Sequence, residues 1–532
     1  MASPKALASE ATPLGTITSK ASLARTTFRS QRTKPLSYRL SQLRKLYWAL
    51  VDNTDLILES CKTDLNKSAF ETYVTELDWC KNDIVFVTQH LSDWMKDEAA
   101  PYIPFANKVL SPQIRKDPLG AVLVIGCWNF PLQLSLGPLI GAVAAGCTAI
   151  LKPSEVSPTT AMVLKKVVED ALDPEAYSVV IGGVEESTAL LNEKWDKIFY
   201  TGNAQVGTII AKKAAETLTP VTLELGGRNP AIVTKNADAS LAARRLLWGK
   251  VLNAGQVCIS QNYTLVDKEI LDSFVDQLKT AMKEFFPKGA KESPDFGRIV
   301  NERHFHRIKK MLDSTKGKIL IGGNTNESEK FIEPTVILVQ SENDPLIENE
   351  SFGPLIPILA YADLGEAIRI ANSVHATPLG LYPFGTKIET DRILSEVISG
   401  GASVNDAFFH GSIPTLAFGG VGDSGQGAYR GKASFDTFTH RRSVTTTPGW
   451  VEKLIGLRYP PYAGKISKLQ FTQNLQPDFD RQGRQIKGLS YWLAALLSLG
   501  GVSTAAVLMR WIGLAAMATA TKKYLETSRR SA

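Results

Sequence analysis

Cysteine and histidine are both scarce in this chain, which has five cysteines and six histidines among 532 residues. The cysteines are widely spaced, odd in number and form no CxxC pair. Disulfide frameworks and structural zinc sites need paired or clustered cysteines. We therefore expect neither of them, assign no metal ligands, and predict a reducing compartment.

The chain also lacks an excess of one charge sign. Its 60 basic and 53 acidic residues give a net charge of +7, and the charges are scattered along the sequence. Nucleic-acid binding usually needs a concentrated basic patch, so no nucleic-acid partner is expected. The 44% hydrophobic fraction is typical of a globular protein, and the length predicts two or three domains.

The first residues lack the apolar core of a secretory signal. Residues 1–45 contain nine Lys or Arg and one acid, Glu10, a faint likeness to a transit peptide. Residues 35–62, however, already indicate a folded helix with apolar residues at helical spacing. We therefore expect the N-terminal region to belong to the folded protein.

One long run near the end of the chain has no charge at all. Residues 489–509 are 21 uncharged residues, flanked by basic residues on both sides. A helix of this length would span roughly 30 Å, the thickness of a bilayer's hydrocarbon core. The run predicts a C-terminal membrane helix that anchors the protein with the rest of the chain in the cytosol. The alternative is an amphipathic or buried helix, because serines and glycines dilute the hydrophobicity.

Strand and helix signals alternate between residues 120 and 216. The expected strands are 120–128, 148–152, 177–183 and 197–202, and the expected helices are 131–146, 157–172 and 203–216. This alternation predicts an α/β fold with a parallel sheet that is covered by helices on both faces and binds ligands at the carboxyl ends of its strands. A second α/β set begins after about residue 225.

Two strand ends carry residues that suit a dinucleotide. In "LKPSE", Lys152 and Glu155 can bind ribose hydroxyls. In "FYTGNAQVG", Gly202 and Gly207 lie where a strand meets a helix, and the free N–H groups of a helix N-terminus attract phosphate. Each motif alone fits an ordinary loop equally well. Because Glu155 would repel a 2'-phosphate, NAD is favoured over NADP.

Reactive groups occur in four further motifs. Cys258 in "NAGQVCIS" is a nucleophile or a small buried residue. Glu224 in "LELGG" is in apolar company, which raises a carboxyl pKa toward that of a general base, although a salt-bridged glutamate is the alternative. Asn129 in "CWNFP" can donate to an oxyanion or cap a helix. In "ENESFGP", Glu350 can bind ribose hydroxyls and Phe352 can pack near the cofactor.

In their order and spacing, "LELGGRNP", "GQVCIS" and "ESFGP" resemble the signature set of the aldehyde dehydrogenase superfamily. Residues 405–444 are similar to the C-terminal block of its class 3, or fatty aldehyde dehydrogenase, branch. The resemblance runs from about Arg29 to Pro461, and the hydrophobic tail is similar to that of membrane-bound fungal members.

The resemblance implies an NAD(P)-dependent aldehyde dehydrogenase. Cys258 would attack the aldehyde as thiolate, Asn129 and the Cys258 N–H would hold the oxyanion, and hydride transfer would leave a thioester. Glu224 would activate the water that releases the acid. The implied cofactor contacts are Lys152, Glu155, Gly202, Gly207, Glu350 and Phe352.

The resemblance also implies a domain order and a homodimer. The expected parts are a Rossmann-like NAD-binding domain at 20–225 with a bridging hairpin at 102–120, a catalytic α/β domain at 226–440, a bridging or oligomerisation segment at 441–462, a linker at 463–488 and the membrane segment at 489–521.

A long hydrophobic aldehyde is the expected substrate, because Phe130, Leu132, Phe408 and Phe409 lie beside the motifs and the tail favours lipid. Fatty aldehydes are the first choice. An apocarotenal that is oxidised to its apocarotenoid acid is the second, and a 4-hydroxybenzaldehyde is the third.

The sequence departs from the branch at Ala204, where threonine is usual, which puts one cofactor contact in doubt. His410 fits the branch pattern as either a substrate contact or a structural histidine. A cysteine hydrolase or acyltransferase would use the same thiol, but no Cys–His pair is evident. CoA-acylating relatives do not need Glu224, and a catalytically inactive scaffold would not need to keep Cys258, Glu224 and Asn129 together.

Overall fold

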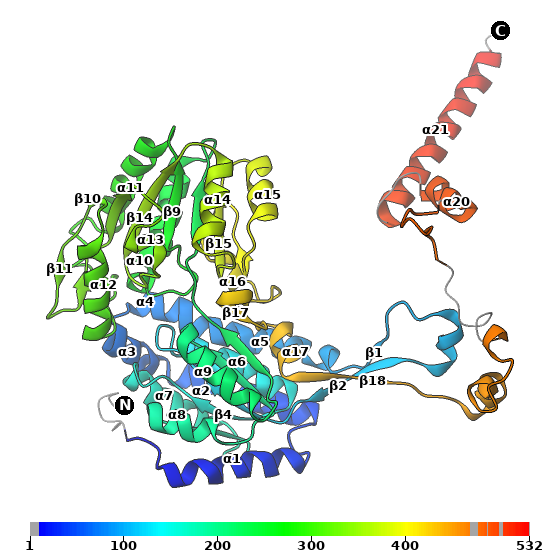
Figure 1. Ribbon diagram of the computed structural model, residues 1–532, viewed down its shortest axis with the longest axis horizontal. Helices are drawn as coiled ribbons and strands as arrows, with labels where there is room; N and C mark the ends of the chain where they lie inside the picture. Colours follow the sequence, from blue (N-terminus) through cyan, green and yellow to red (C-terminus); the bar gives the residue numbers. More distant parts are fainter. Residues whose placement is uncertain (1–9, 469–476, 487, 499–503, 531–532) are drawn as a thin grey trace. The chain divides into compact units, whose positions relative to one another are not determined.

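The computed structural model describes residues 10–468, 477–486, 488–498 and 504–530. The chain divides into two compact units (Figure 1). The main unit comprises Met1–Ala99 and Gln113–Val444, and the second unit comprises Ala100–Pro112 and Thr445–Ala532.

The first sheet of the main unit has six strands in the order β17-β7-β6-β3-β4-β5. Its strands are β3 (Ala121–Ile125), β4 (Thr148–Lys152), β5 (Tyr177–Val179), β6 (Lys197–Thr201), β7 (Val221–Glu224) and β17 (Gly425–Gln426). All neighbours are parallel except β17, which pairs antiparallel with β7. Because Ile125 pairs with Lys152 and Thr201 pairs with Glu224, the carboxyl ends of four strands lie along one edge.

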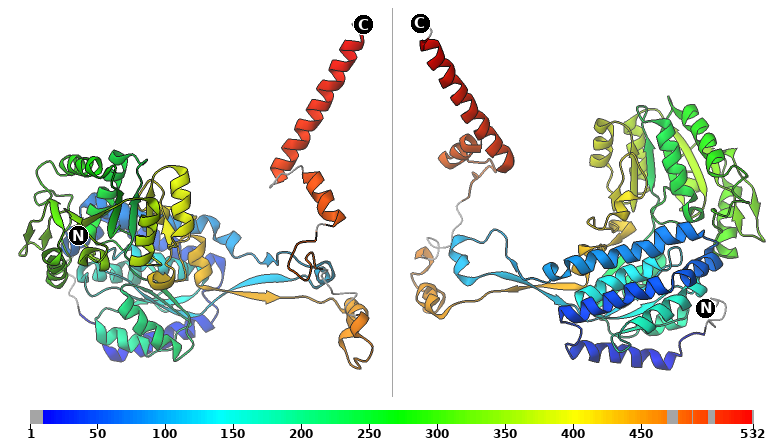
Figure 2. Two further views of the ribbon diagram at one scale, coloured as in Figure 1. Left: turned by 45° about the horizontal axis from the view of Figure 1, so that its top comes forward. Right: turned by 180° about the vertical axis from the view of Figure 1, so that it is seen from behind.

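Helices cover both faces of this sheet because its buried residues alternate along each strand. Val122 and Val124 face one apolar cluster, whereas Ala121 and Leu123 face another. The first cluster includes residues of α2 (Leu36–Asp52), α5 (Asp78–Trp94), α6 (Gln133–Ala145) and α7 (Pro158–Ala171). The second includes residues of α1 (Leu14–Arg29), α8 (Val184–Leu191) and α9 (Ala204–Ala215). Figure 2 shows these helices from two further sides.

The segment before α5 changes helical type several times. It contains α3 (Thr54–Leu65), α4 (Ala69–Thr72) and a π-helical turn over Tyr73–Leu77 that continues directly into α5. Helix α17 (Lys432–Thr437) packs against α6 from the far end of the main unit's sequence.

The second sheet has seven strands in the order β10-β13-β14-β9-β8-β15-β16. Its strands are β8 (Pro230–Val233), β9 (Tyr263–Asp267), β10 (Lys318–Ile321), β13 (Thr335–Val339), β14 (Leu355–Tyr361), β15 (Gly380–Phe384) and β16 (Gly401–Ala402). Only β10 is antiparallel to its neighbour.

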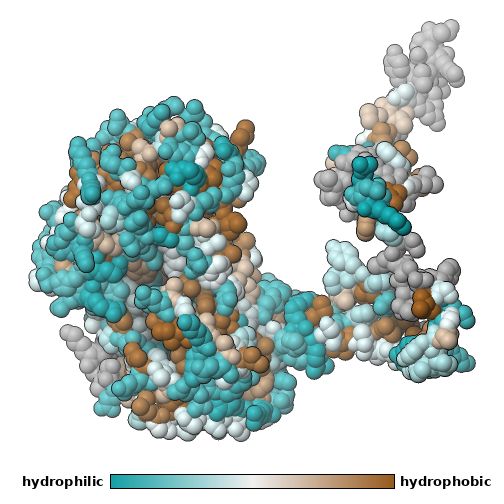
Figure 3. Space-filling view, viewed as in Figure 1, coloured by the Kyte–Doolittle hydropathy of each residue, from teal (hydrophilic) through white to brown (hydrophobic). Residues whose placement is uncertain are grey.

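The helices around the second sheet share its apolar core. They are α10 (Ala239–Val251), α11 (Leu271–Phe285), α12 (Glu302–Ser314), α13 (Pro345–Glu348), α14 (Leu364–Val374), α15 (Lys387–Glu396) and α16 (Phe409–Ser412). Short pieces complete the set: the 3-10 turns Leu252–Gly255 and Gly422–Ser424, and the ribbon of β11 (Thr325–Asn326) and β12 (Phe331–Ile332). In Figure 3 the visible face of the main unit is mostly hydrophilic, with scattered apolar residues.

The predicted α/β fold with Rossmann-like parallel sheets is confirmed. The strand expected at 148–152 has those bounds, and the helices expected at 131–146, 157–172 and 203–216 each differ by one or two residues at the ends. The division into an NAD-binding and a catalytic domain at residue 225 stays a prediction, because compactness places both sheets in one unit.

The proline-broken segment 102–120 contains a 3-10 turn (Phe105–Leu110) in the second unit and β2 (Gln113–Pro118) in the main unit. Strand β2 lies between β1 (Glu98–Ala99) and β18 (Thr439–Val444), with both pairings antiparallel. The second unit also contains the 3-10 turns Gly449–Val451 and Gly456–Arg458 around α18 (Glu452–Ile455).

The predicted C-terminal membrane helix is wrong. Helix α20 (Leu489–Ser498) has ten residues, about 15 Å, and α21 (Thr504–Arg530) contains Arg510 and further charges toward its end. Residues 499–503 of the predicted span lie outside the described residues. Among the residues described, no helix is both long enough and apolar enough to cross a membrane.

Candidate active site

Cys258 lies in a turn whose backbone is unusual. The 3-10 turn Leu252–Gly255 ends α10, and three successive residues within it have left-handed φ: Asn253 at +48°, Ala254 at +52° and Gly255 at +75°. Such angles are costly for residues with a Cβ. A Cβ on Gly255 would lie 2.2 Å from the carbonyl oxygen of Gly353. We call residues 253–260, which include Cys258, the cysteine turn. Because position 255 is glycine, the backbone of the cysteine turn can lie directly against the backbone of the "ESFGP" segment.

Asn229 fixes the cysteine turn from the other side. Its Nδ2 donates to the carbonyl oxygens of Cys258 and Ser260, each at 2.8 Å, and its Oδ1 accepts from the Gly380 N–H at 2.8 Å. This asparagine belongs to "LELGGRNP", so that motif holds the Cys258 turn with one residue and supplies Glu224 with another. Our sequence analysis did not assign Asn229 a role.

Asn129 also reaches the cysteine turn. It lies four residues beyond the end of β3 and is 1% exposed. Its Nδ2 donates to the carbonyl oxygen of Gln256 at 3.1 Å, and its own carbonyl accepts from Asn253 Nδ2 at 2.7 Å. The structure thus links Asn129, through Gln256 and Asn253, to the segment that directly precedes Cys258.

Glu224 is the last residue of β7 and is 3% exposed. Neither carboxyl oxygen has a hydrogen-bond partner in the described part of the chain. Burial raises the pKa of Glu224 well above its usual value. No ion pair to Glu224 occurs in the described part of the chain, so the alternative of a salt-bridged structural glutamate is wrong, and burial favours the neutral carboxyl over the charged one.

The Cys258 thiol lies near several acidic groups. Burial raises its pKa, and neighbouring Cys127, Glu350 and Glu224 raise it further. These interactions show that Glu224 and Glu350 lie within electrostatic reach of the thiol. Positive charges and helix N-termini near a thiol lower its pKa, so a group of this kind would favour the Cys258 thiolate.

Lys152 and Glu155 form an ion pair at the carboxyl end of β4. The Nζ–Oε2 distance is 2.6 Å, with the Lys152 side chain 3% exposed and that of Glu155 49% exposed. Glu155 is half-buried; burial raises its pKa, but Lys152 prevails and the pKa lies below its usual value. A charged carboxylate oriented by a lysine at a strand end is a suitable acceptor for the two hydroxyls of a ribose.

Gly202 and Gly207 flank the start of α9. The helix is capped by Asn203, whose side chain accepts from the Val206 N–H at 2.9 Å, and its first residues are exposed. A Cβ on Gly202 would lie 2.1 Å from Tyr200 Oη, and one on Gly207 would lie 2.9 Å from Leu225. The glycines therefore allow close packing, and the remaining free N–H groups of the first turn face outward, where they fit a phosphate.

Glu350 and Phe352 come from the segment between α13 and β14. Burial raises the pKa of Glu350 to about 7, against the Gly227 N–H and the positive charges of Arg307, Lys250 and Arg228. Its Oε2 would lie 2.5 Å from a Cβ on Gly226, so the carboxyl packs directly on "LELGG". The Phe352 ring meets Trp128 edge-on with centroids 5.4 Å apart.

The sequence analysis missed several residues that shape this region. The Gln256 carbonyl oxygen accepts a hydrogen bond from Asn129 Nδ2, and Cys127 is a second thiol, which raises the Cys258 pKa. The ring of His304 from α12 lies 5.1 Å from that of Trp128. Gln256 and Cys127 lie inside the motifs already singled out, so their positions could have been tested. His304 gave no signal in the sequence.

His410 has a structural role on one side of its ring. Its Nδ1 lies 2.9 Å from Ser403 Oγ, and the ring stacks on Phe418. Its Nε2 has no partner in the described part of the chain. Of the apolar residues expected to line the substrate path, Phe130, Leu132 and Phe408 are buried, whereas Phe409 is 54% exposed.

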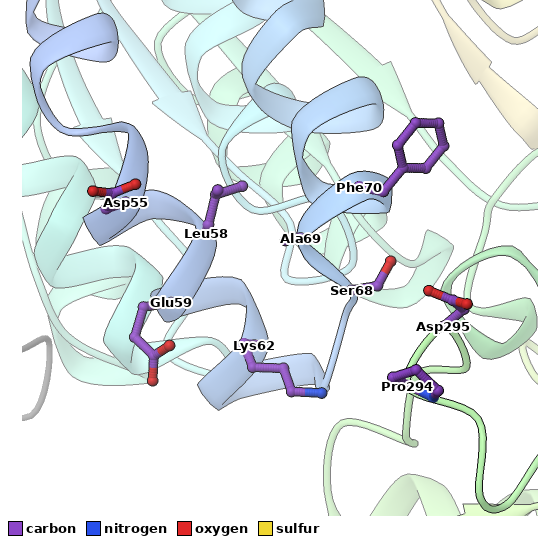
Figure 4. A pocket seen from close by; sticks show the side chains of 9 residues that line it. All are labelled: Asp55, Leu58, Glu59, Lys62, Ser68, Ala69, Phe70, Pro294 and Asp295. Carbon is purple, nitrogen blue, oxygen red and sulfur yellow. The ribbon is translucent and has the colours of Figure 1, made fainter.

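A separate cavity of about 460 Å³ opens between α3, α4 and the loop at Pro294 (Figure 4). Its lining contains no thiol and none of the predicted site residues. We therefore do not assign the reaction to it.

A sequence model described as "Aldehyde dehydrogenase family" matches residues 11–444. The chain belongs to the aldehyde dehydrogenase family. The predicted enzyme class, an NAD(P)-dependent aldehyde dehydrogenase that oxidises aldehydes, is thereby confirmed, as is the predicted likeness to class 3 members.

Two curated relatives and one solved structure narrow the comparison. The beta-apo-4'-carotenal oxygenase of Neurospora crassa is 55% identical over 94% of this chain and 95% of its own length. The dimeric NADP-preferring aldehyde dehydrogenase of Mus musculus is 40% identical over 86% of this chain and 100% of its own. A structure entitled "Substrate bound state of Staphylococcus Aureus AldH" is 39% identical, with a TM-score of 0.83 over 86% of this chain and 99% of that one.

Proposed function

We propose that this aldehyde dehydrogenase converts long hydrophobic aldehydes to carboxylic acids through a thioester on Cys258. The observation that carries the assignment is the meeting of Asn129 and the cysteine turn at the Gln256 carbonyl, with the unpartnered Glu224 carboxyl within electrostatic reach of the thiol. One donor, one nucleophile and one proton acceptor are what acyl transfer to water requires.

The first step is attack by the Cys258 sulfur on the aldehyde carbon. One Nδ2 hydrogen of Asn129 is bound to Gln256, and the second can donate to the carbonyl oxygen as it becomes an oxyanion. The amide is held before substrate arrives, so its orientation costs little during the reaction.

Bound NAD(P) would supply the hydride acceptor and a positively charged ring. Lys152 and Glu155 would hold one ribose, the first turn of α9 after Gly202 the phosphates, and Glu350 the other ribose. The exposed first turn of α9 and the Glu155 carboxylate that Lys152 orients fit such a ligand.

The last step is hydrolysis of the thioester. Glu224 takes a proton from water while the water oxygen attacks the acyl carbon, and the Cys258 sulfur leaves. A carboxyl with a raised pKa suits this task, because it accepts the proton more readily than an exposed carboxylate does.

Two substrates compete within the hydrophobic class. Fatty aldehydes follow from the class 3 likeness, and an apocarotenal is supported by the 55% identity to the Neurospora crassa beta-apo-4'-carotenal oxygenase over almost its whole length. Initial rates of NADH formation with hexadecanal, an apocarotenal and 4-hydroxybenzaldehyde test the proposal. A rate with the benzaldehyde above both others would contradict it.

We propose NAD as the preferred cofactor, because the Glu155 carboxylate repels a 2'-phosphate. The NADP-preferring mouse relative makes this a sharp test, with kcat/KM for both cofactors as the measurement. We also propose a homodimer, supported by the same relative's description as dimeric, to be checked by light scattering during size-exclusion chromatography. The cytosolic location, which was inferred together with the C-terminal anchor, and the reducing compartment inferred from cysteine usage both stay predictions.

A further inference from the structure

A fully buried ion pair lies directly behind Asn129. Lys67 Nζ is 2.7 Å from Glu76 Oε1, and both side chains are 0% exposed. The same ammonium donates to the Asn129 carbonyl oxygen at 3.2 Å and lies 4.3 Å from the centre of the Phe130 ring. No step of the proposed reaction uses either charge.

Glu76 holds the continuation of the same segment. Its Oε2 accepts from the N–H groups of Leu132 at 2.9 Å and Gln133 at 3.1 Å, where α6 begins. A carboxylate is favourable at a helix N-terminus. Glu76 itself lies in the π-helical turn Tyr73–Leu77, and such turns are frequent at functional sites. The ion pair therefore makes hydrogen bonds with three main-chain atoms of residues 129–133.

A residue of the cysteine turn also binds the main-chain carbonyl of Asn129. Asn253 Nδ2 donates to Asn129 O at 2.7 Å, and the Asn253 N–H donates to Glu71 Oε1 at 2.8 Å. Burial raises the pKa of Glu71 to about 7, while Lys67 lowers it. The Asn129 main chain is thus fixed by Lys67 and Asn253, and its side chain by Gln256.

We propose that Lys67 and Glu76 are positioning residues for the oxidation, which fix the main chain at Asn129 so that its side-chain amide meets the developing oxyanion. This inference rests on the proposed function. A buried ion pair adds little stability over apolar residues of the same volume, because desolvation offsets the attraction. Positioning, in contrast, is sensitive: a shift of about 1 Å can cost about 100-fold in rate.

The main test replaces both charges at once with Lys67→Met and Glu76→Gln. The volume is kept, no unpaired charge remains, and the amide oxygen at position 76 can still accept from α6. We expect kcat to fall about 10- to 100-fold, with the NAD dissociation constant changed less than about twofold and the melting temperature within a few degrees. Wild-type kcat in the folded variant would overturn the inference.

A double-mutant cycle with Asn129→Ala separates positioning from general structural damage. Asn129→Ala alone is expected to lower kcat about 10²- to 10³-fold. If the pair acts through Asn129, adding Lys67→Met and Glu76→Gln to Asn129→Ala lowers kcat no further. Losses that multiply would overturn the inference.

The same cycle distinguishes a failure of the proposed function from a failure of this inference alone. Wild-type turnover in Asn129→Ala would overturn the oxyanion role in the proposed function and the inference with it. A normal Asn129→Ala loss beside an unaffected pair variant would overturn the inference alone.

The chain offers a matched control. Lys116 is also buried and bridges a glutamate, Glu98 at 2.5 Å, and a main-chain carbonyl, that of Trp94 at 2.7 Å. Lys116→Met with Glu98→Gln should leave kcat unchanged, and an equal loss there would overturn the inference.

If the variant at Lys67 and Glu76 fails to fold, Asn253→Gly is tested instead. This substitution removes the other donor to the Asn129 carbonyl oxygen and keeps the left-handed backbone. It should lower kcat at least about 10-fold, without a further loss in Asn129→Ala.

Discussion

The two sheets of the main unit each bring one buried glutamate to the site, and the two glutamates have different neighbours. Glu224, from the first sheet, has no hydrogen-bond partner in the described chain, and burial raises its pKa well above normal. Glu350 lies beside the second sheet, and burial raises its pKa to about 7 against the Gly227 N–H and the positive charges of Arg307, Lys250 and Arg228. The comparison shows that burial alone does not set a role: an isolated carboxyl suits proton transfer, whereas one among bases suits binding.

The largest expected effect comes from removing the Cys258 thiol. Cys258→Ala should lower aldehyde oxidation at least about 10³-fold, because the proposed nucleophile is removed. NAD binding, followed by tryptophan fluorescence, should stay within twofold. Substantial turnover in this variant would show that the sheets serve a different reaction.

Replacing the isolated carboxyl should stop the cycle after the thioester forms. Glu224→Gln should lower steady-state kcat about 10²- to 10⁴-fold, while a rapid burst of NADH equal to the enzyme concentration persists. A burst that is lost together with kcat would place Glu224 in an earlier step.

The same variant should also change stability with pH. Because the folded-state pKa of Glu224 is raised, the wild type loses stability as pH rises through that pKa, and glutamine does not. Thermal unfolding should show Glu224→Gln more stable than wild type by about 1 to 3 kcal/mol at pH 9 and equal to it only below the ordinary glutamate pKa of 4.5. A difference that shrinks with rising pH would contradict the assignment.

Replacing Glu350 should weaken NAD binding rather than slow the chemical steps. Glu350→Gln should raise KM for NAD about 10-fold, the effect of one hydrogen bond to a charged group, with kcat changed about threefold or less. A loss confined to kcat would mean that both glutamates act on protons.

The smallest effect concerns the exposed carboxylate of the first sheet. Glu155→Gln should raise kcat/KM for NADP about three- to tenfold, because a repulsive charge is removed while the ion pair with Lys152 is lost. Unchanged cofactor preference would show that Glu155 lies away from the 2' position.

Local patterns predicted much of this arrangement. The strand 148–152 and the helices beside it follow from β-branched runs and helical spacing, and Glu224, Asn129 and Cys258 stand in motifs whose spacing is visible in the sequence. The bonds that join them cross large distances in sequence, as from Asn253 to Glu71 and from Lys67 to Asn129. Helical and strand periodicity concerns residues that are close in sequence, so it does not predict these long-range hydrogen bonds.

The C-terminal prediction failed for the opposite reason. The run 489–509 was judged by its lack of charge, but α20 ends at Ser498 and α21 extends through Arg510 to Arg530, so the described helices divide the run and place charge beside it. Helix α6 is just as apolar and wholly buried within the main unit, so an uncharged run alone does not reveal its surroundings.

The contact between Gly255 and Gly353 sets a boundary for engineering the enzyme. Any side chain at position 255 would wedge two catalytic segments apart, since a methyl group already collides with a main-chain oxygen there. Mutant libraries aimed at new aldehydes should therefore hold Asn253, Ala254 and Gly255 constant and diversify the exposed Phe409, where shape can change without moving the nucleophile.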